Sequence, residues 1–250
     1  MKESTLLRVP VTLGTREELL GKVLSLLECG GTVATVNAAM LEYAYTHTAF
    51  HRTLCEMSLC IPDGKGVSLA FCGRDEKTDT LPGVELGLLV PASRQNLRIA
   101  LYGGKGDVAS RAGEYLLSIS PTSEIVYSRD GYHHTPFEVC KDLATLSPDL
   151  VYIALGSPKQ EEVTRLLSAI LPNALIIALG GSFDVWCGDK ARAPKKMQSL
   201  GLEWLWRMMK EPRRFTKIPT LIAFSYHAFL ENMHTKSTKT KEKSQGVRKF

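Results

Sequence analysis

Short apolar runs alternate along most of the chain with longer segments whose apolar positions recur at helical spacing. A short apolar run bounded by Gly, Pro or polar residues predicts a strand, and recurrence every three to four residues predicts a helix. The predicted strands are residues 32–36, 58–61, 97–102, 124–127, 150–155 and 175–179. The predicted helices between them include residues 38–54, 107–118, 136–146 and 158–170.

This alternation of strands and helices predicts an α/β fold. Several of the strands are apolar throughout rather than at every second position, which is expected when helices cover both faces of a sheet. We therefore predict a doubly wound, mostly parallel, Rossmann-like sheet. Ligands of such sheets bind beyond the carboxyl ends of the strands, so the residues that follow each strand are the first candidates for a site.

Small or polar residues follow five of the six predicted strands. Asn37 follows the first, Asp63 the second, and the loops "GGKGD", "GSPKQEE" and "GGSFD" follow three others. An Asp before a Gly, as at Asp63, is ordinary turn chemistry when it stands alone. Five such loops on one sheet edge indicate a binding site, because Gly lets the backbone approach a ligand and helix N-termini attract phosphate.

The loop after residues 97–102 also fits a dinucleotide fingerprint. Gly104-x-Gly106-x-x-Ala109 follows a predicted strand and opens a predicted helix. The acidic residue expected to bind a ribose further along is ambiguous between Glu124 and Asp130. A generic phosphate loop or a tight turn fits the short pattern better, and an NAD-dependent oxidoreductase remains an alternative.

The C-terminal quarter differs from the rest of the chain in charge and pattern. Residues 190–250 carry a net charge of +11 and the whole chain +5, which leaves −6 for residues 1–189. Apolar helical segments at 200–209 and 220–230 flank the basic stretch "KEPRRFTKIP". We interpret them as an amphipathic appendage, with two core helices as the alternative. The basic charge indicates an anionic partner, for which lipid headgroups fit better than nucleic acid, or a solubilising tail.

The remaining composition restricts the compartment and the chemistry. With 250 residues, 44% hydrophobic and 23% charged, the chain has room for one large α/β core. Its six cysteines contain no C-x-x-C pair, and no secretory signal or long apolar run is present. We therefore expect a reducing, cytoplasmic location. Neither an Asp-x-Asp clamp nor a P-loop occurs, and we predict no metal and no cofactor.

Six blocks of the sequence carry a resemblance to a known family. They are "TVNAAML", "IPDGKGV", "LYGGKGD", "GSPKQEE", "GGSFDVWCGDKARAP" and "LGLEWLWRMMKEPRRF". In sequence and order they are similar to the WecG/TagA/CpsF glycosyltransferases, from about residue 32 to residue 217. The last three blocks are long, which makes the resemblance specific.

The resemblance implies an inverting, metal-independent glycosyltransferase of bacterial surface-polymer synthesis. Such enzymes move an N-acetylmannosamine-type sugar from a UDP donor to a polyprenyl-diphosphate-linked saccharide. The resemblance makes Asp63 the general base, with Thr35 and Asn37 beside it, and assigns Gln160, Arg207 and Arg214 to the site. It also implies that the C-terminal appendage meets the inner face of the cell membrane and helps to complete the site.

The site prediction combines the strand ends with this resemblance. The predicted catalytic residues are Asp63, Thr35 and Asn37. The predicted substrate-binding residues are Gly103, Gly104, Gly156, Pro158, Gln160, Glu161, Gly181, Asp184, Arg192, Arg207, Arg213 and Arg214. We expect an α/β core at residues 1–190, a membrane-associating appendage at 191–234 and a basic flexible tail at 235–250.

Three positions depart from the family pattern. Thr80 and Lys217 stand where the family has arginine, and Glu85 where it has aspartate. Lysine keeps the charge of arginine but lacks its two-pronged hydrogen bonding. These departures leave the donor sugar open, as well as the alternative of a binding module without catalysis. The sequence also leaves open the acceptor glycan and whether the chain forms a homo-oligomer.

Overall fold

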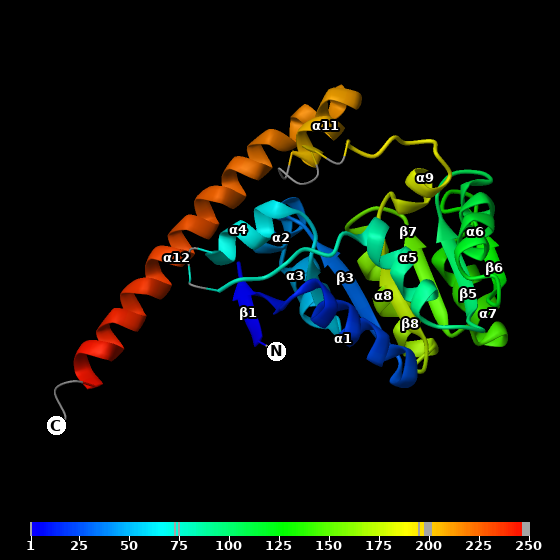
Figure 1. The fold of residues 1–250 in the computed structure, drawn as a ribbon, viewed down its shortest axis with the longest axis horizontal. Coiled ribbons are helices and arrows are strands. Elements are labelled where there is room, and N and C mark those ends of the chain that lie inside the picture. Colours follow the sequence, from blue (N-terminus) through cyan, green and yellow to red (C-terminus); the bar gives the residue numbers. More distant parts are fainter. Residues whose placement is uncertain (1, 73, 75, 195, 198–201, 247–250) are drawn as a thin grey trace.

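The computed structural model describes residues 2–72, 74, 76–194, 196–197 and 202–246. The side chains of residues 2, 207, 212–214 and 236–246 lie outside that description. A six-stranded parallel sheet forms the centre of the body (Figure 1), with the strand order β4-β3-β8-β7-β5-β6. Its strands are β3 Gly31–Val36, β4 Leu59–Pro62, β5 Arg98–Gly103, β6 Glu124–Arg129, β7 Leu150–Ala154 and β8 Leu175–Ala178.

Helices cover both faces of this sheet. They are α1 Arg16–Cys29, α2 Ala38–Thr46, α3 Thr48–Cys55, α4 Lys65–Cys72, α5 Gly83–Ser93, α6 Val108–Ile119, α7 Pro136–Leu146, α8 Lys159–Ile170 and α9 Ser182–Trp186. Apolar side chains of α1, α5, α6 and α9 pack on one face. Those of α2, α3, α4, α7 and α8 pack on the other.

Side chains alternate between these two faces along each strand, as the pleat requires. On β5, Ile99 and Leu101 join the first face, while Ala100 and Tyr102 join the second. Because both faces are covered, every position of β7 and β8 is buried. This arrangement confirms the predicted doubly wound parallel sheet.

The predicted helix 38–54 is two helices in the structure. Helix α2 ends at Thr46, and His47 has extended backbone angles (φ −124°, ψ 96°) before α3 begins. Polar side chains contact a carbonyl oxygen of the last helical turn. The Thr46 hydroxyl lies 3.2 Å and His47 Nδ1 lies 3.0 Å from the Tyr43 carbonyl oxygen. Such local bonds compete with helix continuation, and the apolar pattern does not report them.

The chain begins with a β-hairpin, which the apolar pattern did not predict. Strands β1 Lys2–Leu6 and β2 Val9–Leu13 pair antiparallel around Leu7 and Arg8. Both turn residues have positive φ, at 49° and 67°. Two-residue hairpin turns usually have Asn or Gly at these positions, and this turn has neither.

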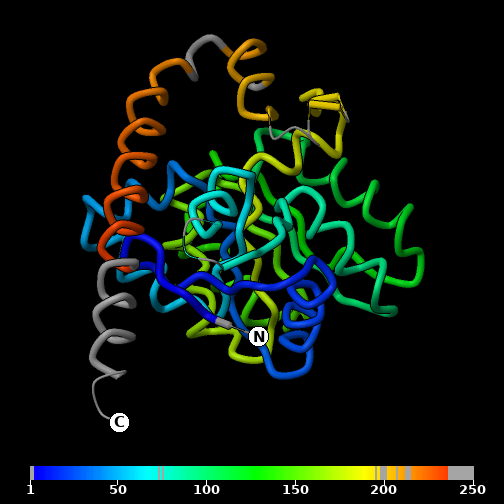
Figure 2. Tube along the Cα trace, turned by 60° about the vertical axis from the view of Figure 1, so that its left-hand side comes forward, coloured from blue at the N-terminus to red at the C-terminus, as the bar shows by residue number. Residues whose placement is uncertain are grey.

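The C-terminal elements return to the body instead of standing apart from it. After α11 Glu203–Lys210 and the short η1 Pro212–Lys217, helix α12 Ile218–Gly246 runs along one side of the body and extends past it (Figure 1). Phe224 and Ala228 are buried in the same apolar cluster as Met40 and Leu41 of α2. Figure 2 shows α12 beside the N-terminal hairpin, where Leu7 N–H donates to Glu231 Oε2 at 2.8 Å.

The segment predicted as a basic flexible tail, residues 235–250, is helical as far as Gly246, and its flexibility stays a prediction. Helix α12 continues through residues 235–246, and residues 247–250 lie outside the described part of the chain. The four Lys residues of this stretch favour helix while its five Ser and Thr residues do not, and extending an existing helix avoids the cost of nucleating a new one.

We expect Phe224→Ala to lower the free energy of unfolding by about 3 kcal/mol, because it removes a buried aromatic side chain from the contact between α12 and α2. Phe229 lies on the same helix and is 61% exposed, so Phe229→Ala serves as the control and should change little. Urea denaturation of both variants measures the difference. Equal stabilities would contradict the docking of α12.

Candidate active site

A cleft of about 1230 Å³ opens at the carboxyl-end edge of the sheet. Its walls come from the segments after β3, β4, β7 and β8, from α2, from residues 189–192, and from the C-terminal elements. It is larger than a typical small-ligand pocket of about 300–1,000 Å³, so it has room for more than one small substrate. Eight of the predicted site residues line it: Thr35, Asn37, Asp63, Gly156, Pro158, Gln160, Gly181 and Arg192.

Asp63 lies on the cleft wall, directly after β4. Its N–H donates to the Val36 carbonyl at 2.8 Å, which continues the β3–β4 pairing one step past the strand. Gly64 then takes a left-handed φ of 93° and α4 begins at Lys65. The Pro-Asp-Gly turn therefore leaves the Asp63 side chain partly exposed where the sheet meets the cleft.

Thr35 and Asn37 form hydrogen bonds at the carboxyl end of β3, the strand next to β4. Thr35 is buried, and its hydroxyl donates to the Ala178 carbonyl at 3.3 Å. Asn37 Oδ1 accepts hydrogen bonds from the N–H groups of Ala39 and Met40 and so caps α2. Both contacts fix the path of the backbone where β3 enters the cleft. They give these residues a structural role, and their predicted catalytic role stays a prediction.

A buried polar network joins the loops after β7 and β8. Gln160 Oε1 accepts from the N–H of Gly180 at 2.9 Å, and Gln160 Nε2 donates to Glu161 Oε1 at 2.7 Å. Glu161 is fully buried and does not line the cleft, so the structure does not place it where a substrate contact was predicted. Burial raises the pKa of Glu161 to about 7, although the hydrogen bond from Gln160 acts to lower it.

Arg192 reaches the cleft from an ion-pair cluster. Both Arg16 and Arg192 hydrogen-bond to the carboxylate of Glu85. Burial acts to raise the pKa of Glu85, but the hydrogen bonds and charges of the two arginines outweigh it and hold the pKa below its usual value. This pairing fixes a guanidinium on the cleft wall. Thr80 is half-buried and is not among the residues that line the cleft.

Two further ion pairs hold the segment that leads from the body to the C-terminal elements. Arg111 of α6 binds both carboxylate oxygens of Asp189, at 2.9 and 2.6 Å. Lys190 Nζ lies 2.9 Å from Asp184 Oδ2. Asp184, predicted to bind substrate, does not line the cleft and is a partner of Lys190, which does.

Gly103 at the end of β5 and Gly104 after it lie outside the cleft lining. A Cβ at Gly103 would be 2.3 Å from the Ala154 carbonyl oxygen, and one at Gly104 would be 2.7 Å from the Val108 side chain. Close packing of strand, loop and helix therefore explains both glycines. Their predicted contact with substrate stays untested.

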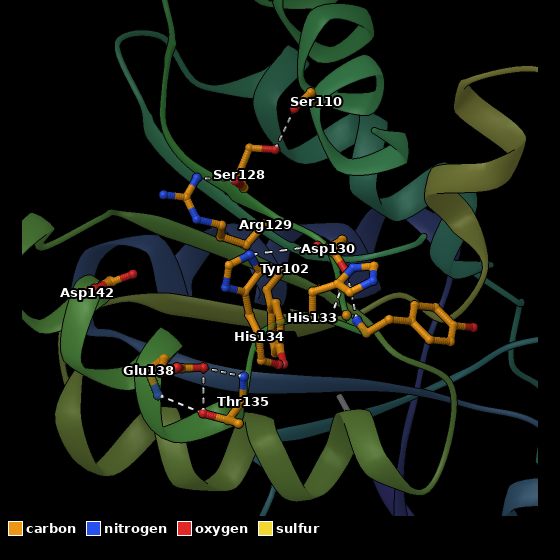
Figure 3. Close-up of polar contacts among 12 residues, drawn as sticks. Tyr102, Ser110, Ser128, Arg129, Asp130, His133, His134, Thr135, Glu138 and Asp142 are labelled. Atoms are coloured by element: carbon orange, nitrogen blue, oxygen red, sulfur yellow. Dashed lines mark hydrogen bonds and ion pairs between the residues drawn. The ribbon is translucent and has the colours of Figure 1, made fainter. Parts of the chain in front are cut away.

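Asp130 follows β6 at the same edge but is occupied by its own turn. Its Oδ1 accepts from the N–H groups of Tyr132 and His133 and from His133 Nδ1, each at 2.9 Å (Figure 3). The two main-chain hydrogen bonds hold the pKa of Asp130 below its usual value. A carboxylate bound in this way is poorly placed to grip a ribose, which weakens the dinucleotide alternative.

Helix α2 supplies one wall that the site prediction missed. Ala39 and Tyr43 of α2 line the cleft, as does His47 directly after the helix. Their spacing of four residues is a signal that was available in the sequence, because a helix beginning after Asn37 places these positions on one face. Glu42 lines the cleft as well, and its carboxylate lies 3.0 Å from His227 Nδ1 of α12.

For the three predicted C-terminal arginines, the structure describes the position of the backbone only. Arg207 belongs to α11, and Arg213 and Arg214 belong to η1, but their side chains lie outside the described residues. Their neighbours Trp206 and Lys217 line the cleft. The C-terminal elements therefore form part of its wall.

Comparison with known proteins assigns the family. The sequence model of the glycosyl transferase WecG/TagA/CpsF family matches residues 4–238. The chain belongs to this family. The match covers the sheet, the cleft and most of α12, so the WecG/TagA/CpsF resemblance of the six sequence blocks is confirmed, and the chain is a glycosyltransferase.

Two relatives in this family carry a specific name. The chain is 31% identical over 211 residues to an N-acetylglucosaminyldiphosphoundecaprenol N-acetyl-beta-D-mannosaminyltransferase of Bacillus subtilis (strain 168), covering 83% of this chain and 82% of the relative. It is 30% identical over 193 residues to the enzyme of the same name from Bacillus spizizenii, covering 76% and 75%.

The described residues contain neither a cluster suited to a metal ion nor a helix suited to crossing a membrane. No group of three or more His, Cys, Asp or Glu side chains in this part of the chain is arranged to hold a metal ion. No helix within it combines the length and the apolar character needed to cross a bilayer.

The Glu85 cluster predicts an acid-sensitive contribution to stability. Because the folded-state pKa of Glu85 is lowered, its stabilisation is present above the unfolded pKa of about 4.5 and is lost as the pH falls through the folded pKa. At pH 7 we expect Glu85→Gln to cost about 1 kcal/mol, since the arginines are partly exposed. Urea denaturation at pH 7 and at pH 3 measures the difference from the unsubstituted protein.

The control is Glu28→Gln, because the pair of Glu28 and Arg94 is largely exposed. It should change stability little at either pH. A Glu85→Gln penalty that persists unchanged at pH 3 would contradict the ionic origin of the effect.

Proposed function

We propose that this enzyme transfers an N-acetylmannosamine-type sugar from a UDP donor to a polyprenyl-diphosphate-linked saccharide, with inversion at the anomeric carbon and without a metal ion. The observation that carries the proposal is the shared cleft of Asp63, the glycine loops and Arg192. The names of the two relatives support the sugar and the acceptor class. The product would contribute to a bacterial surface polymer.

Asp63 acts as the general base in this proposal. Its carboxylate takes the proton from the acceptor hydroxyl while the hydroxyl oxygen forms a bond to the anomeric carbon. The bond from that carbon to the β-phosphate oxygen breaks, and UDP leaves with the electron pair. One displacement of this kind inverts the anomeric centre, and general-base assistance contributes about 10²–10⁴-fold.

Cationic side chains on the cleft walls support stabilisation of the departing diphosphate. Arg192, Lys190, Lys210 and Lys217 all line the cleft. Charge-assisted hydrogen bonds from such groups neutralise the charge that develops on the leaving oxygen. The backbone at Gly156, with a left-handed φ of 78° and no atom within 4 Å of a Cβ position, leaves space for the phosphates beside them.

Helix α12 connects the cleft with a surface suited to a lipid-linked acceptor. Ile222, Tyr226, Phe229 and Met233 recur along one side of the helix and are 56–65% exposed. Pro219, Thr220 and Ala223 of the same helix line the cleft. An apolar helix face next to basic residues is what binding at a membrane interface requires. We place the enzyme at the inner face of the cell membrane, where its acceptor is anchored.

The first test is release of UDP from a panel of UDP-sugars. We expect release from UDP-N-acetylmannosamine that depends on a polyprenyl-diphosphate-linked N-acetylglucosamine acceptor and persists when EDTA is present. If EDTA abolishes UDP release and a divalent cation restores it, the proposal that the transfer needs no metal ion is wrong. Binding of UDP-sugar without release would favour a binding module, and tight NADH binding would favour the oxidoreductase.

Asp63→Asn should reduce turnover at least about 100-fold, because an amide cannot accept the proton at neutral pH. The affinity for UDP should change little, since the substitution preserves the shape of the side chain. Turnover in the UDP-release assay and UDP titration by calorimetry measure the two effects. Near-normal turnover in this variant would remove Asp63 as the base.

The double substitution of Ile222 and Phe229 by Ser should weaken binding to anionic vesicles by at least about tenfold, because each exposed apolar side chain contributes about 1.5 kcal/mol or more when buried. Co-sedimentation with vesicles containing phosphatidylglycerol measures this. Phe137 on α7 is 80% exposed, and Phe137→Ser should leave vesicle binding unchanged. Equal binding of both variants would exclude α12 as the anchoring surface.

A further inference from the structure

Glu161 is a buried ionisable residue that the proposed reaction does not use. Its side chain lies in the first turn of α8, is fully buried, and is absent from the cleft lining. Among the described residues, its Oε2 atom has no hydrogen-bond partner. Burying a carboxyl group that is only partly satisfied costs free energy. The other oxygen, Oε1, accepts a hydrogen bond from Gln160 Nε2 at 2.7 Å.

The contact determines which way the Gln160 amide points. A Gln side chain presents an oxygen that accepts and an NH₂ group that donates, and the two ends are nearly equal in size. Here Oε1 accepts from Gly180 N–H and Nε2 donates to Glu161. A flipped amide would direct NH₂ at the Gly180 N–H and its oxygen at the ionised carboxylate, which makes both contacts repulsive. The Gly180 N–H and the Glu161 carboxylate therefore favour the same orientation.

That orientation has two consequences at the cleft. The Gly180 contact ties the loop after β8 to α8, and the residues Gly180 and Gly156 of the two loops both line the cleft. The Gln160 NH₂ group also carries a second N–H that the bond to Glu161 does not use. Gln160 itself lines the cleft although it is only 3% exposed.

We propose that Glu161 is a positioning residue for the transfer reaction: through Gln160 it holds the two glycine loops together and keeps an amide N–H available to the donor's phosphates. The proposal rests on the proposed function for the identity of the ligand. It differs from a direct role, since the Glu161 carboxylate does not reach the cleft.

Two substitutions of Glu161 separate positioning from charge. Glu161→Gln retains an oxygen that can accept from Gln160, so we expect kcat/KM for the UDP-sugar within about threefold of the unsubstituted enzyme. Glu161→Met has a similar length but no comparable acceptor, and we expect kcat/KM to fall by about tenfold or more, the usual effect of losing an oriented polar contact. Equal losses in both variants would overturn the proposal.

A double-mutant cycle tests whether Glu161 acts through Gln160. In a Gln160→Ala background, adding Glu161→Met should cause no further loss of kcat/KM, because the side chain that it positions is gone. Losses that multiply would show that Glu161 acts by another route.

Thr164 is the matched control: it is fully buried, and its hydroxyl donates to the Gln160 carbonyl at 2.8 Å without contacting the side-chain amide. Thr164→Val should leave kcat/KM within about twofold, and a loss as large as that of Glu161→Met would overturn the proposal.

Hydrogen exchange supplies a readout that does not depend on activity. In the unsubstituted protein, we expect one Nε2 hydrogen of Gln160 to exchange at least about 100-fold more slowly than a solvated side-chain amide, as measured by NMR. Fast exchange of both hydrogens would overturn the proposal even if Glu161→Met does not fold. A protein that releases no UDP from any UDP-sugar but protects this hydrogen would contradict the proposed function and leave the Gln160 orientation standing.

Discussion

All six strands of the central sheet run in the same direction, so their carboxyl ends open at one edge of the body. The register of β3 against β4 pairs Val36 with Pro62, so Asn37 and Asp63 leave the sheet side by side. The loops after β7 and β8 emerge beside them. Residues far apart in the sequence therefore share one cleft because four parallel strands that are neighbours in the sheet, β4, β3, β8 and β7, end at the same edge.

The C-terminal helix α12 adds wall residues and an exposed apolar surface to the cleft that the sheet edge forms. Helix α12 docks on α2 through Phe224 and Ala228, and the first residues of the same helix line the cleft. Its exposed apolar side chains face away from this contact. One helix thus links the core, the cleft and the surface proposed to meet lipid. For an enzyme whose proposed acceptor is anchored in a membrane, this linkage would bring the reacting hydroxyl toward the base.

The sequence alone predicted the parallel sheet closely, because six apolar runs between helical segments leave few other folds. It missed features that depend on local polar bonds or unusual turns. The helix break at His47 arises from side chains that bond the Tyr43 carbonyl, and the first hairpin turns at Leu7 and Arg8 without Gly. At the site, strand ends identified Asp63 correctly as a cleft residue. They could not show that Glu161, one position from Gln160, turns into the interior.

The proposed reaction depends most on where the nucleotide diphosphate binds. A crystal structure of the enzyme with UDP tests this directly. We predict that the diphosphate lies in the cleft between the loop at Gly156, the loop at Gly181 and the Arg192 guanidinium, with the Asp63 carboxylate across the space for the donor sugar from the β-phosphate. Density for UDP on the loop at Gly104, away from Asp63, would contradict the account.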